Sequence, residues 1–158
     1  MKWTEGDIEG VDVRASARHA DSRGWLIEVF RSDEMQPDLA PLMGYVSVTH
    51  PGVARGPHEH KEQTDLFGFV GPGTFKIKMW DNRKASPTYG HTRTLVVGEK
   101  NPVVVVVPPG VVHGYRNVSP VDAFVLNFPN RLYAGKGKKS PVDEVRHENE
   151  ANPDFRMD

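Results

Sequence analysis

Short runs of strand-forming residues, each followed by a turn signal, dominate this 158-residue chain and restrict it to an all-β fold. The run TFKIKMW at 74–80 alternates cleanly, with Phe75, Ile77 and Met79 opposite two lysines, which is the pattern of a half-buried strand. The run PVVVVV at 102–107 is β-branched after its first residue and predicts a strand buried on both faces. Further runs are WLIEVF (25–30), GYVSVTH (44–50), TRTLVV (92–97) and AFVLNF (123–128). Because 15 glycines and 13 prolines are scattered among these runs, we expect a sandwich or barrel.

Composition excludes several classes of protein. The net charge is −1 and no basic run stands out, so neither nucleic acid nor an anionic membrane is an expected partner. The chain has no cysteine, which removes disulfides and thiolate chemistry. The N-terminus lacks an apolar signal core, and the longest apolar run, at 103–112, is too short to cross a bilayer. We therefore expect a cytoplasmic protein with one domain over 1–158, a core at about 20–133 and a polar extension at 134–158. That extension either packs on its own domain or lies on a partner subunit.

Two histidine-containing stretches form the first candidate site. In GVARGPHEHKEQTD, His58 and His60 are two residues apart and Asp65 follows; in PPGVVHGYRN, the histidine is His113. Residues i and i+2 of a strand share a face, so His58 and His60 would both point into a barrel. Three imidazoles and a carboxylate suit a borderline divalent ion, whereas HEHKE alone is also typical of a solvated strand end. Both stretches resemble the two motifs of the cupin superfamily, a jelly-roll (double-stranded β-helix) barrel.

A narrower resemblance covers roughly residues 20 to 133. The segments DSRGWLIEVFR (21–31), GVARGPH (52–58), WDNRKASPTYG (80–90) and PPGVVHGY (108–115) occur in that order. Together they resemble the dTDP-4-dehydrorhamnose 3,5-epimerase family. The resemblance implies a cupin homodimer that binds a nucleotide-linked 4-keto-6-deoxyhexose. It implies no cofactor. It also implies an isomerase that abstracts protons beside the ketone, a step that needs a placed base and a group that holds the enolate charge.

The resemblance also implies roles for individual residues. His58 corresponds to the catalytic base, which histidine suits because its pKa lies near neutrality. His113 and His60 would line the sugar site, and Arg55 would hold substrate. The residues that would contact the nucleotide, often across the dimer, are Arg23, Trp25 and Glu28.

The chain departs from the family at four places. Asp65 aligns with a lysine that lies near the substrate oxygen, and Asn127 falls where the proton-donating tyrosine is expected. Tyr133 matches a second family tyrosine that lies nearby, so His58, Tyr133 and Asp65 are the candidate catalytic residues. The late carboxylate that orients the histidine base has no equivalent by alignment. Met43 and Tyr45 replace polar residues that contact the nucleotide.

These departures leave alternatives open. If His58, His60, Asp65 and His113 bind a divalent ion such as Zn, Mn, Fe or Ni, the metal replaces the lysine as electrophile. Without metal, His58 is the base and Asp65 or His60 orients it. A related ketoisomerase family carries RGxHxHK, in which the two histidines would transfer protons between C4 and C3. Two further readings are a metal-dependent cupin with another small-molecule substrate and a non-catalytic sugar-binding cupin, which Asn127 favours.

Overall fold

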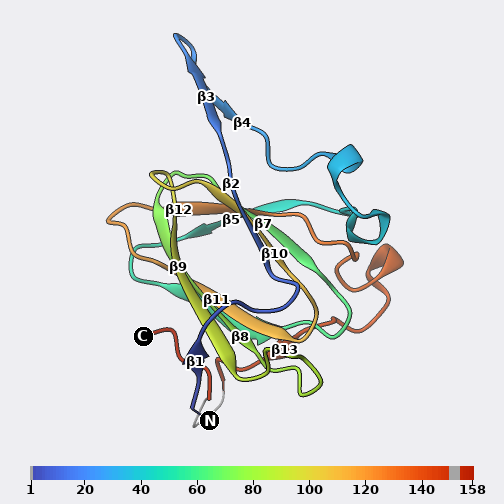
Figure 1. Ribbon diagram of the computed structural model, residues 1–158. Helices are drawn as coiled ribbons and strands as arrows, with labels where there is room; N and C mark the ends of the chain where they lie inside the picture. The colour runs from blue at the N-terminus through green and yellow to red at the C-terminus, as the bar shows by residue number, and fades with distance from the viewer. Residues whose placement is uncertain (1, 150–153) are drawn as a thin grey trace.

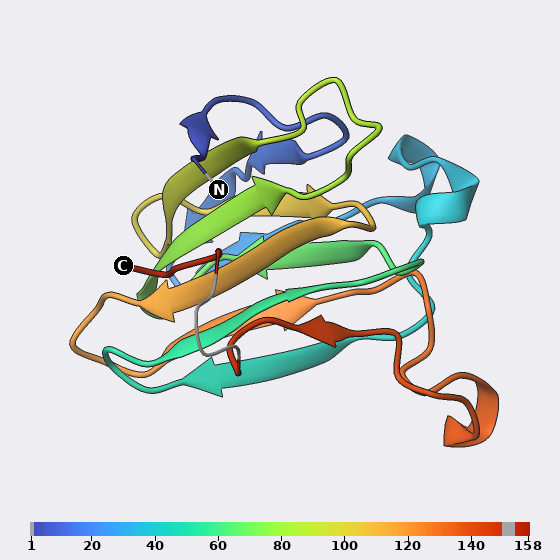
Figure 2. The ribbon, with the colours of Figure 1, turned by 90° about the horizontal axis from the view of Figure 1, so that it is seen from below.

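The computed structural model describes residues 2–149 and 154–158 and shows two β-sheets packed face to face as a jelly-roll barrel (Figures 1 and 2). The six-stranded sheet has the order β1-β9-β8-β11-β6-β13, and the five-stranded sheet has the order β2-β10-β7-β12-β5. The strands of the first sheet are β1 (Thr4–Glu5), β6 (Ala54–Glu59), β8 (Thr74–Asp81), β9 (His91–Gly98), β11 (Val111–Asn117) and β13 (Val145–Arg146). Those of the second are β2 (Asp12–Ala15), β5 (Tyr45–Thr49), β7 (Asp65–Phe69), β10 (Val103–Val107) and β12 (Ala123–Asn127). The all-β prediction is confirmed.

Alternation along β8 decides where the apolar core lies. Phe75, Ile77 and Met79 are fully buried between the sheets, while the intervening lysines are half-buried, as the sequence pattern predicts. Each strand thereby directs every second side chain inward. The apolar residues of the two sheets meet in one large cluster that also includes Phe67, Phe69, Val105 and Tyr115.

The valine strand β10 is buried along its whole length, which confirms the second sequence prediction. It lies between β2 and β7 in the five-stranded sheet and is antiparallel to both. Its inward valines join the main core. Its outward residues Val104 and Val106 pack with Leu66 under Phe30 and Phe128 from the covering loops. Both faces of the strand are covered, and this explains why both are apolar.

A hairpin of β3 (Arg18–Asp21) and β4 (Gly24–Ile27) projects from the barrel (Figure 1). The predicted strand at 25–30 thus ends at Ile27 and pairs with β3 alone, so it forms part of this arm and not of either barrel sheet. After the arm, the chain makes two short 3-10 turns at Ser32–Glu34 and Pro37–Leu39, where the sequence indicates only a limited helical turn. A third short turn, Lys136–Lys138, precedes the C-terminal tail.

The polar tail packs on the barrel of its own chain. Strand β13 pairs antiparallel with β6, where Val145 lies opposite Glu59 and Arg146 opposite His58. Phe155 and Met157 then join Trp80 in a small cluster on the outer side of the six-stranded sheet. The tail consequently brings residues 143–146 beside the histidine strand.

In the described part of the chain, no helix is long and apolar enough to cross a membrane.

Candidate functional site

Four predicted side chains meet at one end of the barrel interior. Strand β6 carries His58 with His60 just beyond it, β7 begins at Asp65, and β11 carries His113 opposite His58. Each of the four offers one nitrogen or oxygen atom, and these atoms all lie within 4.8 Å of one another. Asp65 and His113 are both 1% exposed. The fold therefore gathers the residues that the two sequence motifs single out.

Glycine at position 56 is required for this convergence. Gly56 has φ +74°, a left-handed conformation that residues with a side chain rarely adopt. A Cβ atom there would lie 2.7 Å from the carbonyl oxygen of His113 and 3.0 Å from Nδ1 of His58. The missing side chain thus lets the two histidine strands approach each other.

Asp65 is the buried acceptor at the centre of the cluster. Its Oδ1 accepts hydrogen bonds from the side-chain amides of Gln63 and Asn127, both at 2.9 Å. Its Oδ2 lies 3.2 Å from Nε2 of His60 and 3.3 Å from Nε2 of His113. Burial alone would raise the pKa of Asp65, but the two imidazoles outweigh it and hold that pKa below its usual range. The carboxylate is therefore ionised and faces two ring nitrogens.

His60 and His113 each have a fixed ring orientation. Nδ1 of His113 contacts the carbonyl oxygen of Val111 at 3.0 Å, and Nδ1 of His60 contacts the carbonyl oxygen of Asp143. A carbonyl oxygen only accepts, so each Nδ1 carries the proton. Burial opposes protonation of His60, but the hydrogen bond and charge of Asp65 outweigh it and raise its pKa. Nε2 of His60 also lies 3.1 Å from the side-chain nitrogen of Gln63, so both ring nitrogens of His60 have a close polar neighbour.

His58 differs from these two histidines in its surroundings. Its Nδ1 lies 3.8 Å from Oε1 of Glu144, and its side chain is 16% exposed. Burial lowers the pKa of His58 to about 2, and the neighbouring His113 and His60 add to this effect. His58 is therefore neutral and able to accept a proton, with a carboxylate behind its other nitrogen.

Glu144 is a candidate site residue that the sequence did not reveal. By alignment the late carboxylate of the family has no equivalent in this chain, but the tail strand β13 places Glu144 beside His58. The neighbouring Asp143 anchors this segment, because its carboxylate accepts the backbone N–H groups of residues 61–63. The only sequence signal was the acidic pair in PVDEV, which resembles many other surface segments.

Tyr45 is a second candidate site residue, which alignment gave only as the replacement of a polar residue that contacts the nucleotide. It faces Asn127 across the β5–β12 pair, and Nδ2 of Asn127 donates to its hydroxyl oxygen at 2.8 Å. Because the amide uses its two protons on Tyr45 and Asp65, the hydroxyl keeps its own proton to donate. Burial raises the pKa of Tyr45 to about 12, although the residue is 46% exposed. A protonated hydroxyl therefore lies at the edge of the cluster, on the sheet opposite His58.

Arg55 and Tyr133 lie nearer the surface. Arg55 donates to the hydroxyl of Thr49 and to the carbonyl oxygen of Val48, which holds its guanidinium against β5. Tyr133 is 57% exposed on the loop after β12, and its backbone N–H donates to the sulfur of Met43. The structure thus leaves the predicted roles of both residues as predictions.

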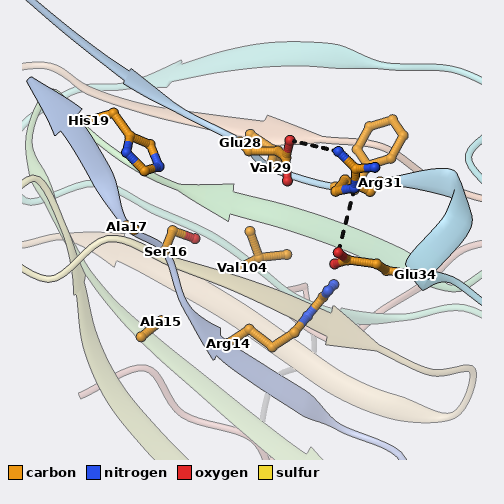
Figure 3. Close-up of a pocket in the computed structure, with 11 residues that line it drawn as sticks. Arg14, Ala15, Ser16, Ala17, His19, Glu28, Val29, Arg31, Glu34 and Val104 are labelled. Atoms are coloured by element: carbon orange, nitrogen blue, oxygen red, sulfur yellow. Dashed lines mark ion pairs between the residues drawn. The ribbon is translucent and has the colours of Figure 1, made fainter.

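The three predicted nucleotide-binding residues lie on or beside the arm. Arg23 pairs with Asp21 at its tip, and the ring of Trp25 lies under the guanidinium of Arg18, 4.4 Å from the ring centroid. Glu28 lines a pocket between the arm and β2 and pairs with Arg31 (Figure 3). None of the four cluster residues lines this pocket. The arm projects from the barrel, so the structure of one chain does not bring these residues to the histidines (Figure 1).

Comparisons with known proteins agree on one family. Residues 5–140 match the family model described as dTDP-4-dehydrorhamnose 3,5-epimerase. Over 128 residues the chain is 40% identical to a protein described as a probable low-salt glycan biosynthesis epimerase, Agl13 of Haloferax volcanii, covering 80% of this chain and 81% of Agl13. It is 34% identical over 128 residues to the spore coat polysaccharide biosynthesis protein SpsL of Bacillus subtilis, covering 80% and 82% of the two chains.

Solved structures share the fold at low sequence identity. ChmJ, a 3′-monoepimerase from Streptomyces bikiniensis solved with dTDP-quinovose, superposes with a TM-score of 0.77 at 20% identity. The match covers 97% of this chain and 82% of ChmJ. At that identity the likeness shows a common barrel, and the family model together with the sequence relatives carries the assignment.

Proposed function

Because the chain belongs to the dTDP-4-dehydrorhamnose 3,5-epimerase family, we propose that it epimerises a dTDP-linked 4-keto-6-deoxyhexose by proton abstraction beside the ketone. The names of its relatives, a probable glycan biosynthesis epimerase and a spore coat polysaccharide biosynthesis protein, support a role in glycan or polysaccharide biosynthesis. We further propose that it works as a cytoplasmic homodimer. In such a dimer, Arg23, Trp25 and Glu28 on the arm would reach the nucleotide bound by the partner barrel.

One observation carries the proposal: His58 lies half-buried at the end of the barrel interior, with Oε1 of Glu144 3.8 Å from its Nδ1. A proton beside a ketone is weakly acidic, so its removal needs an unprotonated base held at a fixed place. When His58 takes that proton, the carboxylate of Glu144 stabilises the imidazolium and keeps its orientation. Glu144 thus takes the orienting role for which sequence reasoning had considered Asp65 and His60.

His60 is a weaker candidate for proton transfer. Its Nδ1 is bound by the carbonyl oxygen of Asp143, and its Nε2 faces Gln63 and Asp65. A base needs a free nitrogen within hydrogen-bond reach of the substrate proton. This arrangement favours epimerisation with one histidine base over the ketoisomerase reading, in which His58 and His60 both transfer protons.

Tyr45 supports inversion at the carbon that loses its proton. Inversion requires a proton donor on the face of the sugar opposite the base. His58 comes from the six-stranded sheet and Tyr45 from the five-stranded sheet, so a sugar held between the sheets would have one on each face. Asn127, at the position of the usual tyrosine, would hold the Tyr45 hydroxyl in place. Tyr133, which matches a second family tyrosine, remains the other candidate for this role.

The test is solvent exchange in heavy water with dTDP-4-keto-6-deoxyglucose, followed by the mass and proton spectrum of the sugar. Gain of two deuterons, at C3 and C5, is the expected result for a 3,5-epimerase. One deuteron at C3 would restrict the activity to C3 epimerisation, or to ketone migration if the carbonyl has moved. No exchange with or without added manganese, zinc or iron would reject this substrate class. Tight binding without exchange would then support the sugar-binding reading that Asn127 favours.

A further inference from the structure

The tail strand β13 brings a guanidinium to the face of the sheet on which His58 lies. In the pairing of β13 with β6, Arg146 lies directly opposite His58, and directly paired residues of a sheet point to the same face. Glu144 is two residues before Arg146, and residues i and i+2 of an extended segment share a face. The tail therefore places a carboxylate and a guanidinium side by side next to the candidate base.

Arg146 holds one oxygen of the Glu144 carboxylate. Nε of Arg146 donates to Oε2 of Glu144 at 2.9 Å, and Nη2 lies 2.8 Å from the same oxygen. The other oxygen, Oε1, is the one that lies 3.8 Å from Nδ1 of His58. The remaining amino group of Arg146, Nη1, pairs with Oε1 of Glu148 at 3.5 Å. A carboxylate turns about its last bond as one plane, so a fixed Oε2 limits where Oε1 can lie.

The main chain beside this carboxylate is anchored by contacts that do not involve Arg146. The backbone N–H of His147 donates to the carbonyl oxygen of Pro57 at 2.9 Å. The ring nitrogen Nε2 of His147 lies 3.0 Å from Oε1 of Glu59, and the ring packs against Phe155 with 4.7 Å between centroids. His147 is buried, whereas the side chain of Arg146 is 60% exposed. A substitution of Arg146 should therefore act on its neighbouring carboxylate and leave the tail in place.

We propose that Arg146 is the positioning residue for Glu144: it holds Oε2 so that Oε1 stays directed at His58. This inference rests on the proposed function, in which Glu144 stabilises the imidazolium that forms on His58. Arginine suits the task because its guanidinium is always charged and presents its donors in one rigid plane. An exposed ion pair adds little to stability, so the effect of a substitution should lie in the reaction and not in the fold.

The kinetics of R146Q, R146K and a control variant measure this role. In R146Q the carboxylate of Glu144 remains but is no longer held, so kcat for solvent exchange should fall by about 10- to 100-fold at an unchanged KM. R146K keeps the charge and should retain more of the rate than R146Q. Arg156 is an exposed arginine of the same tail, and R156Q should behave as wild type. A rise in KM at an unchanged kcat would assign Arg146 to substrate binding and overturn the proposal.

The double variant E144Q/R146Q tests whether Arg146 acts through Glu144. Residues that act as one unit give losses that do not add. Once the carboxylate is an amide, R146Q should lower the rate much less than it does in the wild-type background. The same loss in both backgrounds would show that Arg146 acts independently of Glu144, and the proposal would be wrong.

NMR of the protein without substrate separates the positioning of Glu144 from the proposed reaction. The ring nitrogen shifts of His58, assigned by their absence in H58N, report which nitrogen carries the proton. Because Glu144 faces Nδ1 of His58, E144Q should move these shifts, and R146Q should move them in the same direction while R156Q does not. Unchanged shifts in R146Q would overturn the proposal. The expected shifts without any sugar exchange by the wild type would support it and reject only the proposed reaction.

Discussion

Replacement of Tyr45 by phenylalanine tests whether the base and the proton donor come from different sheets. Y45F removes one hydroxyl from the edge of the cluster and leaves His58, Glu144 and the rest of the site in place. We expect His58 in this variant still to remove the proton and to return a deuteron to the same face. The sugar should then gain deuterium without inversion. The rate of product formation should fall by about 100- to 10,000-fold, the usual contribution of a placed acid.

The effect on stability should be much smaller. Y45F takes one acceptor from Asn127, whose amide still donates to Asp65. The net loss for one hydrogen bond is about 0.5–1.5 kcal/mol, which for a chain of this length lowers Tm by about 1–6 °C. A 100-fold loss of rate corresponds to about 2.7 kcal/mol in the barrier. Unfolding of the variant at assay temperature therefore cannot account for the expected loss of inversion.

The assay follows deuterium incorporation by mass and configuration by the proton spectrum, in wild type, Y45F and Y133F. Y133F is the comparison variant, since Tyr133 matches a second family tyrosine and lies on the exposed loop after β12. Inversion by Y45F within about threefold of wild type would refute the reasoning from the hydroxyl geometry. Loss of inversion in Y133F with retention in Y45F would assign the role to Tyr133.

Three further substitutions test the neighbouring parts of the argument. E144Q removes the charge that faces His58, so proton exchange should fall by about 100-fold or more at an unchanged KM, and an equal loss in KM would indicate a structural role instead. G56A adds a Cβ at φ +74° against a carbonyl oxygen, whereas G52A adds one at φ +76° with nothing within 4 Å. The free energy of unfolding should therefore fall by more in G56A than in G52A. Equal losses would contradict the close approach. The carboxyl group of Asp81 is buried, which favours its neutral form, but a guanidinium and two hydroxyl groups outweigh this and lower its pKa. Its contribution to stability is present above its unfolded pKa of about 3.9 and lost as pH falls below that value, so the Tm difference between wild type and D81N should shrink from pH 6 to pH 3, and a constant difference would refute this.

Sequence periodicity predicts the barrel well because its strands obey simple burial rules. Along β8 the inward residues are apolar and the outward ones are lysines, and β10 is apolar on both faces because loops cover its outer side. The arm was harder to predict, because WLIEVF has the composition of a barrel strand. Only the hairpin partner β3 stops it at Ile27 and directs it outward.

The candidate site also consists of residues that the sequence predicts and residues that it does not. His58, His60, Asp65 and His113 lie in motifs whose spacing predicts a common face. Glu144 was missed because its position depends on a two-residue strand, β13, that pairs with a segment far away in the sequence. Alignment compares positions and gave Tyr45 only as the replacement of a polar residue that contacts the nucleotide, whereas its hydrogen bond to Asn127 depends on the register between β5 and β12. Local patterns thus locate the site, and long-range pairing decides which side chains complete it.

The tail also explains how two adjacent histidines of one strand can serve different purposes. Asp143 presents a backbone carbonyl to His60, which fixes that ring with its Nε2 toward Asp65. Glu144 presents a carboxylate to His58, with Oε1 3.8 Å from Nδ1, while its Oε2 accepts from Arg146 at 2.9 Å. A carbonyl cannot neutralise an imidazolium, but a carboxylate can. The order of these two tail residues therefore fixes the ring of His60 and places the charge of Glu144 beside His58, the histidine that we propose takes the proton.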